Sequence, residues 1–133
     1  MNRTAIKEEA EDMSAAAQEA RAVLIARDND TFRAAIYRGD STVAGRSVHT
    51  AGVEALGLAE TFTAYQKVRD FSEFTEDNDP HGERNFGAFD IAGERLFWKI
   101  DYFADGSCEW GSEDPTDPAQ VFRVLTIMLA SEY

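Results

Sequence analysis

The hydrophobic pattern of the first 27 residues has the period of an α-helix. Its apolar positions recur at steps of three and four and therefore share one face; they are Ile6, Ala10, Met13, Ala17, Ala20 and Leu24. Because alanine dominates this face, we expect weak packing, with a frayed start or a helix that docks only against a partner chain. The run Asp28-Asn29-Asp30 favours caps and turns, so it predicts an interruption before a second helical piece from Thr31 to Tyr37.

The next segment predicts one strand and one helix. Gly39, Asp40 and Ser41 break the second helical piece. A short β-prone run from Ser47 to Ala51 predicts the first strand. From Val53 to Phe71 the helical period returns with a broad apolar face.

A period of two dominates from residue 86 onward. Phe86 to Ile91 predicts a strand that reverses at Ala92-Gly93, and Arg95 to Phe103 predicts the longest strand. The long strand has one face of Leu96, Trp98, Ile100 and Tyr102 and an opposite face of Phe97, Lys99, Asp101 and Phe103. Asp105-Gly106 is a strong hairpin signal and leads into a predicted last strand from Ser107 to Trp110.

The C-terminal residues predict a helix in the core. Asp117 suits an N-cap, Pro118 suits the first helical position, and Gln120 stands three residues after the cap. The residues from Val121 to Leu129 are apolar nearly all round. We therefore predict an α+β fold, an antiparallel β-meander of three to four strands packed against N-terminal and C-terminal α-helices. No linker or repeat divides the chain, so residues 1–133 form one predicted domain, with an accessory helix at 1–24 and a core at 25–133.

Net charge is the strongest bulk property of the chain. Between Asp70 and Asp117 there are fourteen acidic residues against Arg84, Arg95 and Lys99, a balance of −11 out of a total of −12. Such a field repels nucleic acid and anionic membranes and favours basic proteins or cations, so we expect no direct binding to nucleic acid or membrane. The alternative is a solvated face that serves solubility alone. A single cysteine and the lack of an apolar signal segment indicate the cytoplasm.

The acidic turn at residues 77–83 is the strongest candidate for a metal site. An EF-hand loop fails because Ala88 would stand at the twelfth position, where a bidentate Glu is needed. A looser divalent site made of Asp77, Asp79, His81 and Glu83 is the alternative to a turn held by Asx hydrogen bonds. We assign no cofactor.

No motif in the chain indicates a catalytic centre. There is no phosphate-binding Gly-rich loop, no G-x-S-x-G, no H-E-x-x-H and no zinc-type Cys/His spacing. His49, His81 and Cys108 would need to meet in space to form a Cys-His pair, and a structural cysteine is the simpler interpretation. An enzyme is therefore the second class of function that we consider.

Three stretches of the second half form a signature. They are FTEDNDPHGE at Phe74 to Glu83, FWKIDY at Phe97 to Tyr102, and LTIMLASEY at Leu125 to Tyr133. With them the chain, from roughly Ile25 to Tyr133, resembles a bacterial family of small proteins of unknown function that is common on plasmids and other mobile elements. Arg84 stands where that family often has Asp. The family brings no established catalytic residues, and the resemblance implies a mobile-element setting, in which small acidic proteins often block host defence.

The charge and the resemblance together predict an acidic, protein-binding inhibitor. It would occupy the basic site of a nucleic-acid-binding host-defence protein, as a DNA mimic of the anti-CRISPR or anti-restriction type. The predicted acidic face comprises Glu73, Glu76, Asp77, Asp79, Glu83, Asp90, Asp101, Asp105, Glu109, Glu113 and Asp114. Phe97, Trp98 and Trp110 are the predicted aromatic contacts of that face. The alternatives are a divalent-metal-dependent hydrolase or nuclease at Asp77 to Glu83, and a non-catalytic structural or oligomeric protein.

Overall fold

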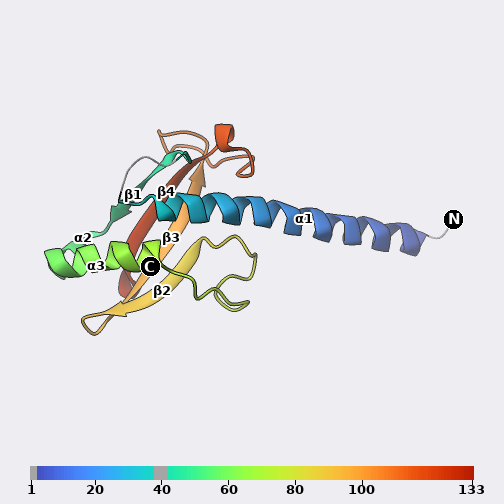
Figure 1. Ribbon diagram of the computed structural model, residues 1–133. Coiled ribbons are helices and arrows are strands. Elements are labelled where there is room, and N and C mark those ends of the chain that lie inside the picture. Colours follow the sequence, from blue (N-terminus) through green and yellow to red (C-terminus); the bar gives the residue numbers. More distant parts are fainter. Residues whose placement is uncertain (1–2, 38–41) are drawn as a thin grey trace.

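A four-stranded mixed sheet with α-helices on one face forms the body of the protein (Figure 1). This computed structural model describes residues 3–37 and 42–133, with side chains for residues 14–37 and 42–133. In chain order the elements are α1 (Arg3–Ala34), β1 (Gly45–His49), α2 (Ala51–Glu54), α3 (Leu58–Arg69), β2 (Phe86–Ile91), β3 (Glu94–Phe103), the 3-10 helix η1 (Pro118–Gln120), β4 (Phe122–Leu129) and the 3-10 helix η2 (Ala130–Glu132). The predicted α+β class is confirmed.

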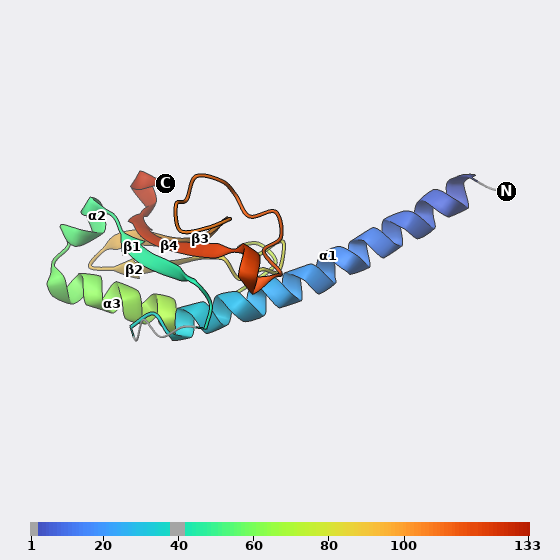
Figure 2. The same ribbon diagram turned by 90° about the horizontal axis from the view of Figure 1, so that it is seen from above.

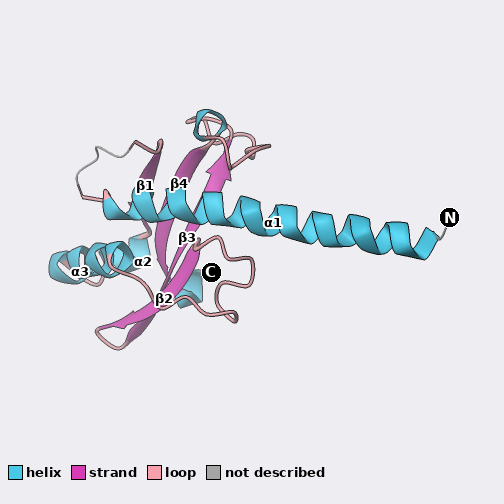
Figure 3. Cartoon of the chain, turned by 45° about the vertical axis from the view of Figure 1, so that its right-hand side comes forward, coloured by secondary structure: helices cyan, strands magenta, loops and turns pink. Residues whose placement is uncertain are grey.

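The sheet has the strand order β1-β4-β3-β2, so the last strand of the chain lies in the interior of the sheet. β2 pairs antiparallel with β3, and β3 pairs antiparallel with β4, whereas β1 runs parallel to β4. Figure 3 shows the four strands side by side, with α1 crossing the sheet. The predicted antiparallel meander is therefore matched only in part: β2 and β3 pair as predicted, but the third antiparallel strand is β4, where a helix was predicted, and β1 is parallel.

The helices and the irregular segments lie on opposite sides of the sheet. Figure 2 shows α1 and α3 on one side and η2 on the other, where the segment 104–121 also begins before it returns past the end of the sheet to η1 beside α1. Leu96, Trp98 and Ile100 point toward the helices and are buried, whereas Phe97 and Lys99 point the other way and are half-buried. The two faces predicted for the long strand are confirmed.

Trp98 lies at the centre of the core and is 0% exposed. The rings of Phe71 and Phe74 pack edge-on against it, with ring centroids 5.5 and 6.1 Å from that of Trp98. Gly87 on the neighbouring strand leaves room for the indole, since a Cβ there would lie 2.3 Å from Trp98 Nε1. The prediction of Trp98 as a surface contact is therefore wrong, because period-two alternation turns it to the opposite side of β3 from Phe97.

α1 runs without a break through Asp28, Asn29 and Asp30, where the sequence predicts an interruption. Asn29 is fully buried and replaces the expected cap with contacts far away in the sequence. Its Nδ2 donates to the carbonyl of Glu83 and to the hydroxyl of Tyr102, both at 2.9 Å, and its Oδ1 accepts from Nε of Arg123 at 2.7 Å. Tertiary hydrogen bonds therefore override the weak helix propensity of this run.

Arg33 attaches the end of α1 to the end of α3. Its Nη1 donates to the carbonyls of Val68 and Phe71 at 2.8 and 3.0 Å, and its Nη2 donates to Asp30 at 2.8 Å. The guanidinium carbon lies 5.0 Å from the Trp98 ring centroid. Because the last carbonyls of a helix lack internal partners and carry partial negative charge, a buried cation stabilises them.

The N-terminal part of α1 projects beyond the body of the protein (Figures 1 and 2). Residues 14–21 are exposed, and burial begins at Ile25. The helix therefore packs through its C-terminal part, in keeping with the alanine-rich face predicted to pack weakly. In the described part of the chain, no helix combines the length and the apolar character needed to span a membrane.

The predicted C-terminal helix is wrong, because residues 122–129 form β4. The cap signal is locally correct: the Asp117 side chain accepts from Ala119 N and from Gln120 Nε2, but the helix η1 that it begins lasts a single turn. The following run contains the β-branched residues Val124, Thr126 and Ile127, which favour a strand. β4 lies between two strands, and such strands read as continuous apolar runs that periodicity cannot distinguish from a buried helix.

Three other predicted boundaries differ from the structure. The helix expected from Val53 to Phe71 divides at Gly57, whose φ of 117° suits glycine. Ser107 to Trp110 forms no strand, and this loop pairs with β3 only through a bridge between Phe103 and Gly111. The first strand begins earlier than predicted, at Gly45. The expected break at residues 39–41 lies outside the described residues.

Gly87→Ala should reduce the free energy of unfolding by roughly 1–3 kcal/mol, the usual cost of overpacking a core. The added methyl group would lie 2.3 Å from Trp98 Nε1 and 2.8 Å from the Phe71 ring. Gly106→Ala is the matched control, because its methyl group would have no neighbour closer than 3.7 Å. Urea denaturation measures both, and equal stabilities would contradict the packing described for Trp98.

Asn29→Ala should destabilise the protein by about 3 kcal/mol, because it leaves the buried Arg123 guanidinium and the Tyr102 hydroxyl without this partner. Gln18→Ala, on the exposed part of the same helix, should change stability by less than about 0.5 kcal/mol. Thermal and urea unfolding of both variants test this. A loss for Asn29→Ala no larger than for Gln18→Ala would show that α1 does not depend on these hydrogen bonds.

Candidate functional site

The topology brings two acidic loops to the same end of the sheet. β2 begins, β3 ends and β4 begins at this end, so the segments 72–85 and 104–121 lie there together. Figure 1 shows them on either side of α1. They contain ten Asp and Glu residues and one basic residue, Arg84. We call these two segments the acidic end.

Most of the carboxylates of the predicted face belong to the acidic end. They are Glu73, Glu76, Asp77, Asp79, Glu83, Asp105, Glu109, Glu113 and Asp114. Two others lie elsewhere: Asp90 is near the β2–β3 hairpin, 3.3 Å from Arg95 Nη1, and Asp101 is on the outer face of β3, 3.0 Å from Lys99 Nζ. The candidate surface is therefore an end of the sheet and not one of its faces.

The first acidic loop is held by Asx hydrogen bonds. Asn78 accepts from Thr75 N at 2.8 Å and donates from Nδ2 to the carbonyl of Glu73 at 2.8 Å. Asp79 accepts from Arg84 N at 3.0 Å, and Gly82 supplies a φ of 71°. The predicted Asx turn is confirmed. Across the described residues, no three His, Cys, Asp or Glu side chains gather as a metal site.

The first acidic loop is also attached to α1. Arg84 Nη1 donates to Asp30 at 2.8 Å, and the carbonyl of Glu83 accepts from the buried Asn29. The Arg84 guanidinium lies 5.3 Å from the Phe74 ring centroid. The carboxylates that remain exposed on this loop therefore project from a braced backbone.

The second acidic loop has its own internal hydrogen bonds. Ala104 N donates to the carbonyl of Trp110 at 2.8 Å, and Ser112 Oγ donates to the carbonyl of Gln120 at 2.7 Å. Asp114 accepts from the backbone N–H and the hydroxyl of Thr116, and lies 4.0 Å from Arg21 of α1. Both loops thus present carboxylates from fixed backbones.

The aromatic side chains predicted for this surface differ sharply in exposure. Trp110 is 74% exposed on the second acidic loop, whereas Trp98 is buried in the core. Phe97 is half-buried and packs against Phe86 and Tyr133 on the outer face of the sheet, with ring centroids 5.2 and 5.6 Å away. Trp110 is therefore the large apolar side chain that the acidic end offers to a partner.

A family model described as a protein of unknown function (DUF3768) matches residues 49–132. The chain belongs to the DUF3768 family. No curated protein and no solved structure matches it. Both acidic loops and strands β2 to β4 of the DUF3768 domain lie within the matched region, whereas α1 precedes it. Helix α1, which carries Asn29 and Arg33, therefore lies outside the region that the DUF3768 model matches.

The histidines and the cysteine of this DUF3768 protein do not form a nucleophilic pair. His49 lies at the end of β1, away from the acidic end, where its Nδ1 is 2.7 Å from the Tyr65 hydroxyl and its Nε2 contacts Glu54. Cys108 lies in the second acidic loop, and its sulfur accepts from Arg46 Nη2 at 3.4 Å. His81 is exposed on the first acidic loop.

Local hydrogen bonds keep carboxylates of the acidic end ionised. The hydroxyl and the backbone N–H of Ser107 lower the pKa of Asp105. Gln120 and the backbone N–H of Ala119 lower the pKa of Asp117. Asp117, predicted as a helix cap, thus also contributes a charge to the acidic end. Since donors stabilise the charged form, these groups keep their charge into mildly acidic solution.

Ser107→Ala should raise the pKa of Asp105 toward that of an unperturbed aspartate, because it removes the donating hydroxyl. Carboxyl-carbon NMR titration measures this. In the unmodified protein the Asp105 midpoint should lie below the ordinary aspartate range, and Ser131→Ala at the far end should leave it unchanged. An Asp105 midpoint that does not respond to Ser107→Ala would contradict this hydrogen bond.

Proposed function

We propose that this DUF3768 protein is an inhibitor that binds another protein through its acidic end and competes with nucleic acid for the partner's basic surface. The observation that carries the proposal is the meeting of the two acidic loops, distant in sequence, around α1. Ten carboxylates against one arginine give this end a strongly negative field. Such a field attracts basic surfaces whose Lys and Arg side chains bind the phosphates of nucleic acids.

The rigidity of the two loops supports binding over mere solvation. Asn78, Asp79, Asp105 and Asp114 each fix their own loop through local hydrogen bonds. A surface that is already ordered loses little conformational entropy when a partner docks. Carboxylates that served solubility alone would need no such fixed geometry.

Trp110 supplies the apolar contact that charge alone lacks. Charged contacts at the rim of an interface mainly raise the association rate and set specificity, whereas a buried tryptophan contributes a large share of affinity. Trp110 follows Glu109 directly and remains 74% exposed. We assign it as the central contact, surrounded by the carboxylates of the acidic end.

The finer proposal concerns the identity of the partner. A mobile-element setting, which the sequence resemblance implies, makes a restriction enzyme or a CRISPR effector complex the proposed target. Either would grip nucleic acid through Lys and Arg and would offer the basic surface that the acidic end requires. The metal-dependent alternative has no comparable support, because the described residues hold no gathered set of metal ligands.

The test is a pull-down of nucleic-acid-binding proteins from a bacterial lysate, with this protein as bait and with duplex DNA as competitor. The expected partner is retained at low salt, displaced by DNA and released as salt screens the charges. With the identified partner, Glu109→Arg and Trp110→Ala should each weaken binding at least about tenfold.

Glu94→Arg is the matched control, because it makes the same charge change at the β2–β3 hairpin, far from the acidic end. It should bind like the unmodified protein. Equal losses for Glu94→Arg and Glu109→Arg would mean that total charge matters and the acidic end does not. Retention of no nucleic-acid-binding protein would reject the proposed function.

A further inference from the structure

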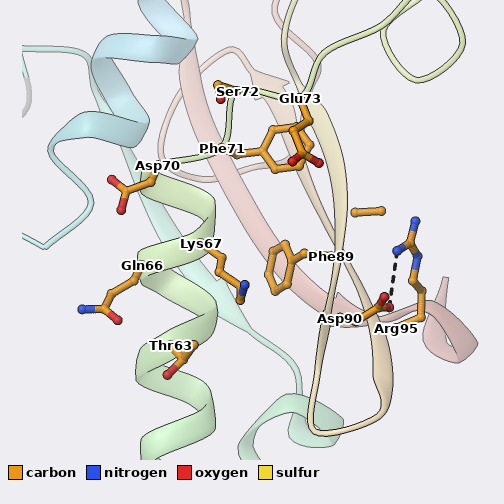
Figure 4. Close-up of a pocket in the computed structure, with 11 residues that line it drawn as sticks. Thr63, Gln66, Lys67, Asp70, Phe71, Ser72, Glu73, Phe89, Asp90 and Arg95 are labelled. Atoms are coloured by element: carbon orange, nitrogen blue, oxygen red, sulfur yellow. Dashed lines mark hydrogen bonds and ion pairs between the residues drawn. The ribbon is translucent and has the colours of Figure 1, made fainter.

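A groove of about 700 Å³ runs between α3 and β2 (Figure 4). Lys67 and Asp70 come from the helical side, and Phe89 and Asp90 come from the strand. β2 is an edge strand, since its one strand partner in the described part of the chain is β3. The groove therefore follows an open edge of the sheet.

The register of the hairpin shows which backbone groups face this groove. Ala92 and Gly93 have φ angles of 53° and 81°, as in the two-residue turns that close on a hydrogen-bonded pair, here Ile91 with Glu94. Every second residue back from Ile91 therefore bonds to β3, and the carbonyl of Asn85 accordingly accepts from Ile100 N at 2.9 Å. The residues between them, Phe86, Ala88 and Asp90, turn their N–H and C=O groups away from β3, to the open edge of the sheet, which the groove follows at Ala88 and Asp90.

β2 lacks most of the devices that protect edge strands from pairing. Its sequence, FGAFDI, contains no proline and no lysine, and its register with β3 is continuous, without a bulge. Its one charged side chain, Asp90, is already paired with Arg95. An edge of this kind is a template for another strand.

The charges along the groove are self-complementary. Phe71, at the end of the groove that holds Glu73, lies against Gly87, since a Cβ on Gly87 would be 2.8 Å from the Phe71 ring. Lys67 points toward Phe89 (Figure 4). Lys67 and Glu73 thus lie on opposite sides of the Ala88 position, and neither side chain forms an ion pair with any other described residue.

We propose that β2 pairs antiparallel with β2 of a second copy of this chain, about a twofold axis at Ala88. A twofold axis exchanges the two halves of the groove, so Glu73 of each copy faces Lys67 of the other. The small Ala88 side chain lies at the axis, and the outward N–H and C=O groups of Phe86, Ala88 and Asp90 find partners. The two sheets become one continuous sheet.

A second copy fits this groove better than an unrelated peptide for a reason of symmetry. Lys67 and Glu73 lie on either side of Ala88. A twofold rotation about Ala88 exchanges their positions, so each charge faces the opposite charge of the other copy. Because the paired strands run antiparallel, the two acidic ends lie at opposite ends of the joined sheet, and their carboxylates other than Glu73 stay exposed. The inference is therefore independent of the proposed function.

The test is the association state of the full chain by sedimentation equilibrium over a range of concentrations. We expect a dimer. Lys67→Glu and Glu73→Lys should each weaken dimerisation about tenfold by setting like charges opposite one another. The double variant, Lys67→Glu with Glu73→Lys, should recover most of the affinity because it restores opposite charges.

Glu76→Lys is the matched control, since it makes the same change as Glu73→Lys on the same loop but outside the groove. It should dimerise normally, and thermal unfolding should show that all four variants remain folded. A monomer at every concentration would overturn the inference. So would a dimer that ignores the single reversals, or a double variant that shows no recovery.

Discussion

The attachment of α1 through buried polar side chains is the constraint on which the rest of this structure depends. A helix whose apolar face is mostly alanine has little hydrophobic area with which to bind a sheet. Asn29 and Arg33 replace that area with directed hydrogen bonds, to the first acidic loop, to β3 and β4, and to the carbonyls that end α3. Removing either residue would leave buried polar groups elsewhere without partners, so these contacts fix orientation as well as contribute stability.

This attachment also explains how so much negative charge is kept together. Mutual repulsion among ten carboxylates favours opening the two loops. Asn29 holds the backbone at Glu83, and Arg84 reaches back to Asp30, so the first acidic loop is tied to the same helix that separates it from the second. Burial raises the pKa of the Tyr102 hydroxyl, which therefore stays neutral as the acceptor for Asn29. A buried polar cluster of Asn29, Tyr102 and the Arg123 guanidinium therefore supports the backbone that carries this charge.

Local signals in the sequence predicted the parts of the fold that depend on local chemistry. The limits of β2, the reversal at Ala92-Gly93 and the two faces of β3 follow from alternation and turn preference. The Asx turn around Asn78 and the cap at Asp117 were likewise visible. The strand at residues 122–129 could not be predicted in this way, because its apolar run suits a buried helix as well as a central strand. Only pairing with β1 and β3 decides between the two.

The candidate site was predictable in composition but not in arrangement. The carboxylates were evident from the sequence, yet their meeting around α1 depends on β4 being a strand, since that is what returns the second acidic loop to the end of the sheet where β2 begins. The burial of Trp98 follows from alternation alone, whereas the exposure of Trp110 needs the loop that replaces the predicted last strand. The partners of Asn29, more than fifty residues away, had no sequence signal.

The interior position of β4 has a consequence for the folding of the newly synthesised chain. β4 is synthesised after β1 and β3, the two strands between which it lies. Until then the nascent chain exposes the apolar side of a β2–β3 hairpin and a β1 segment with no strand to pair. The sheet closes by long-range pairing. Such pairing is slow, because the entropy of loop closure is lost before the new contacts form. The sheet therefore cannot close before β4 has been synthesised, and until then the exposed apolar surfaces are available to chaperones.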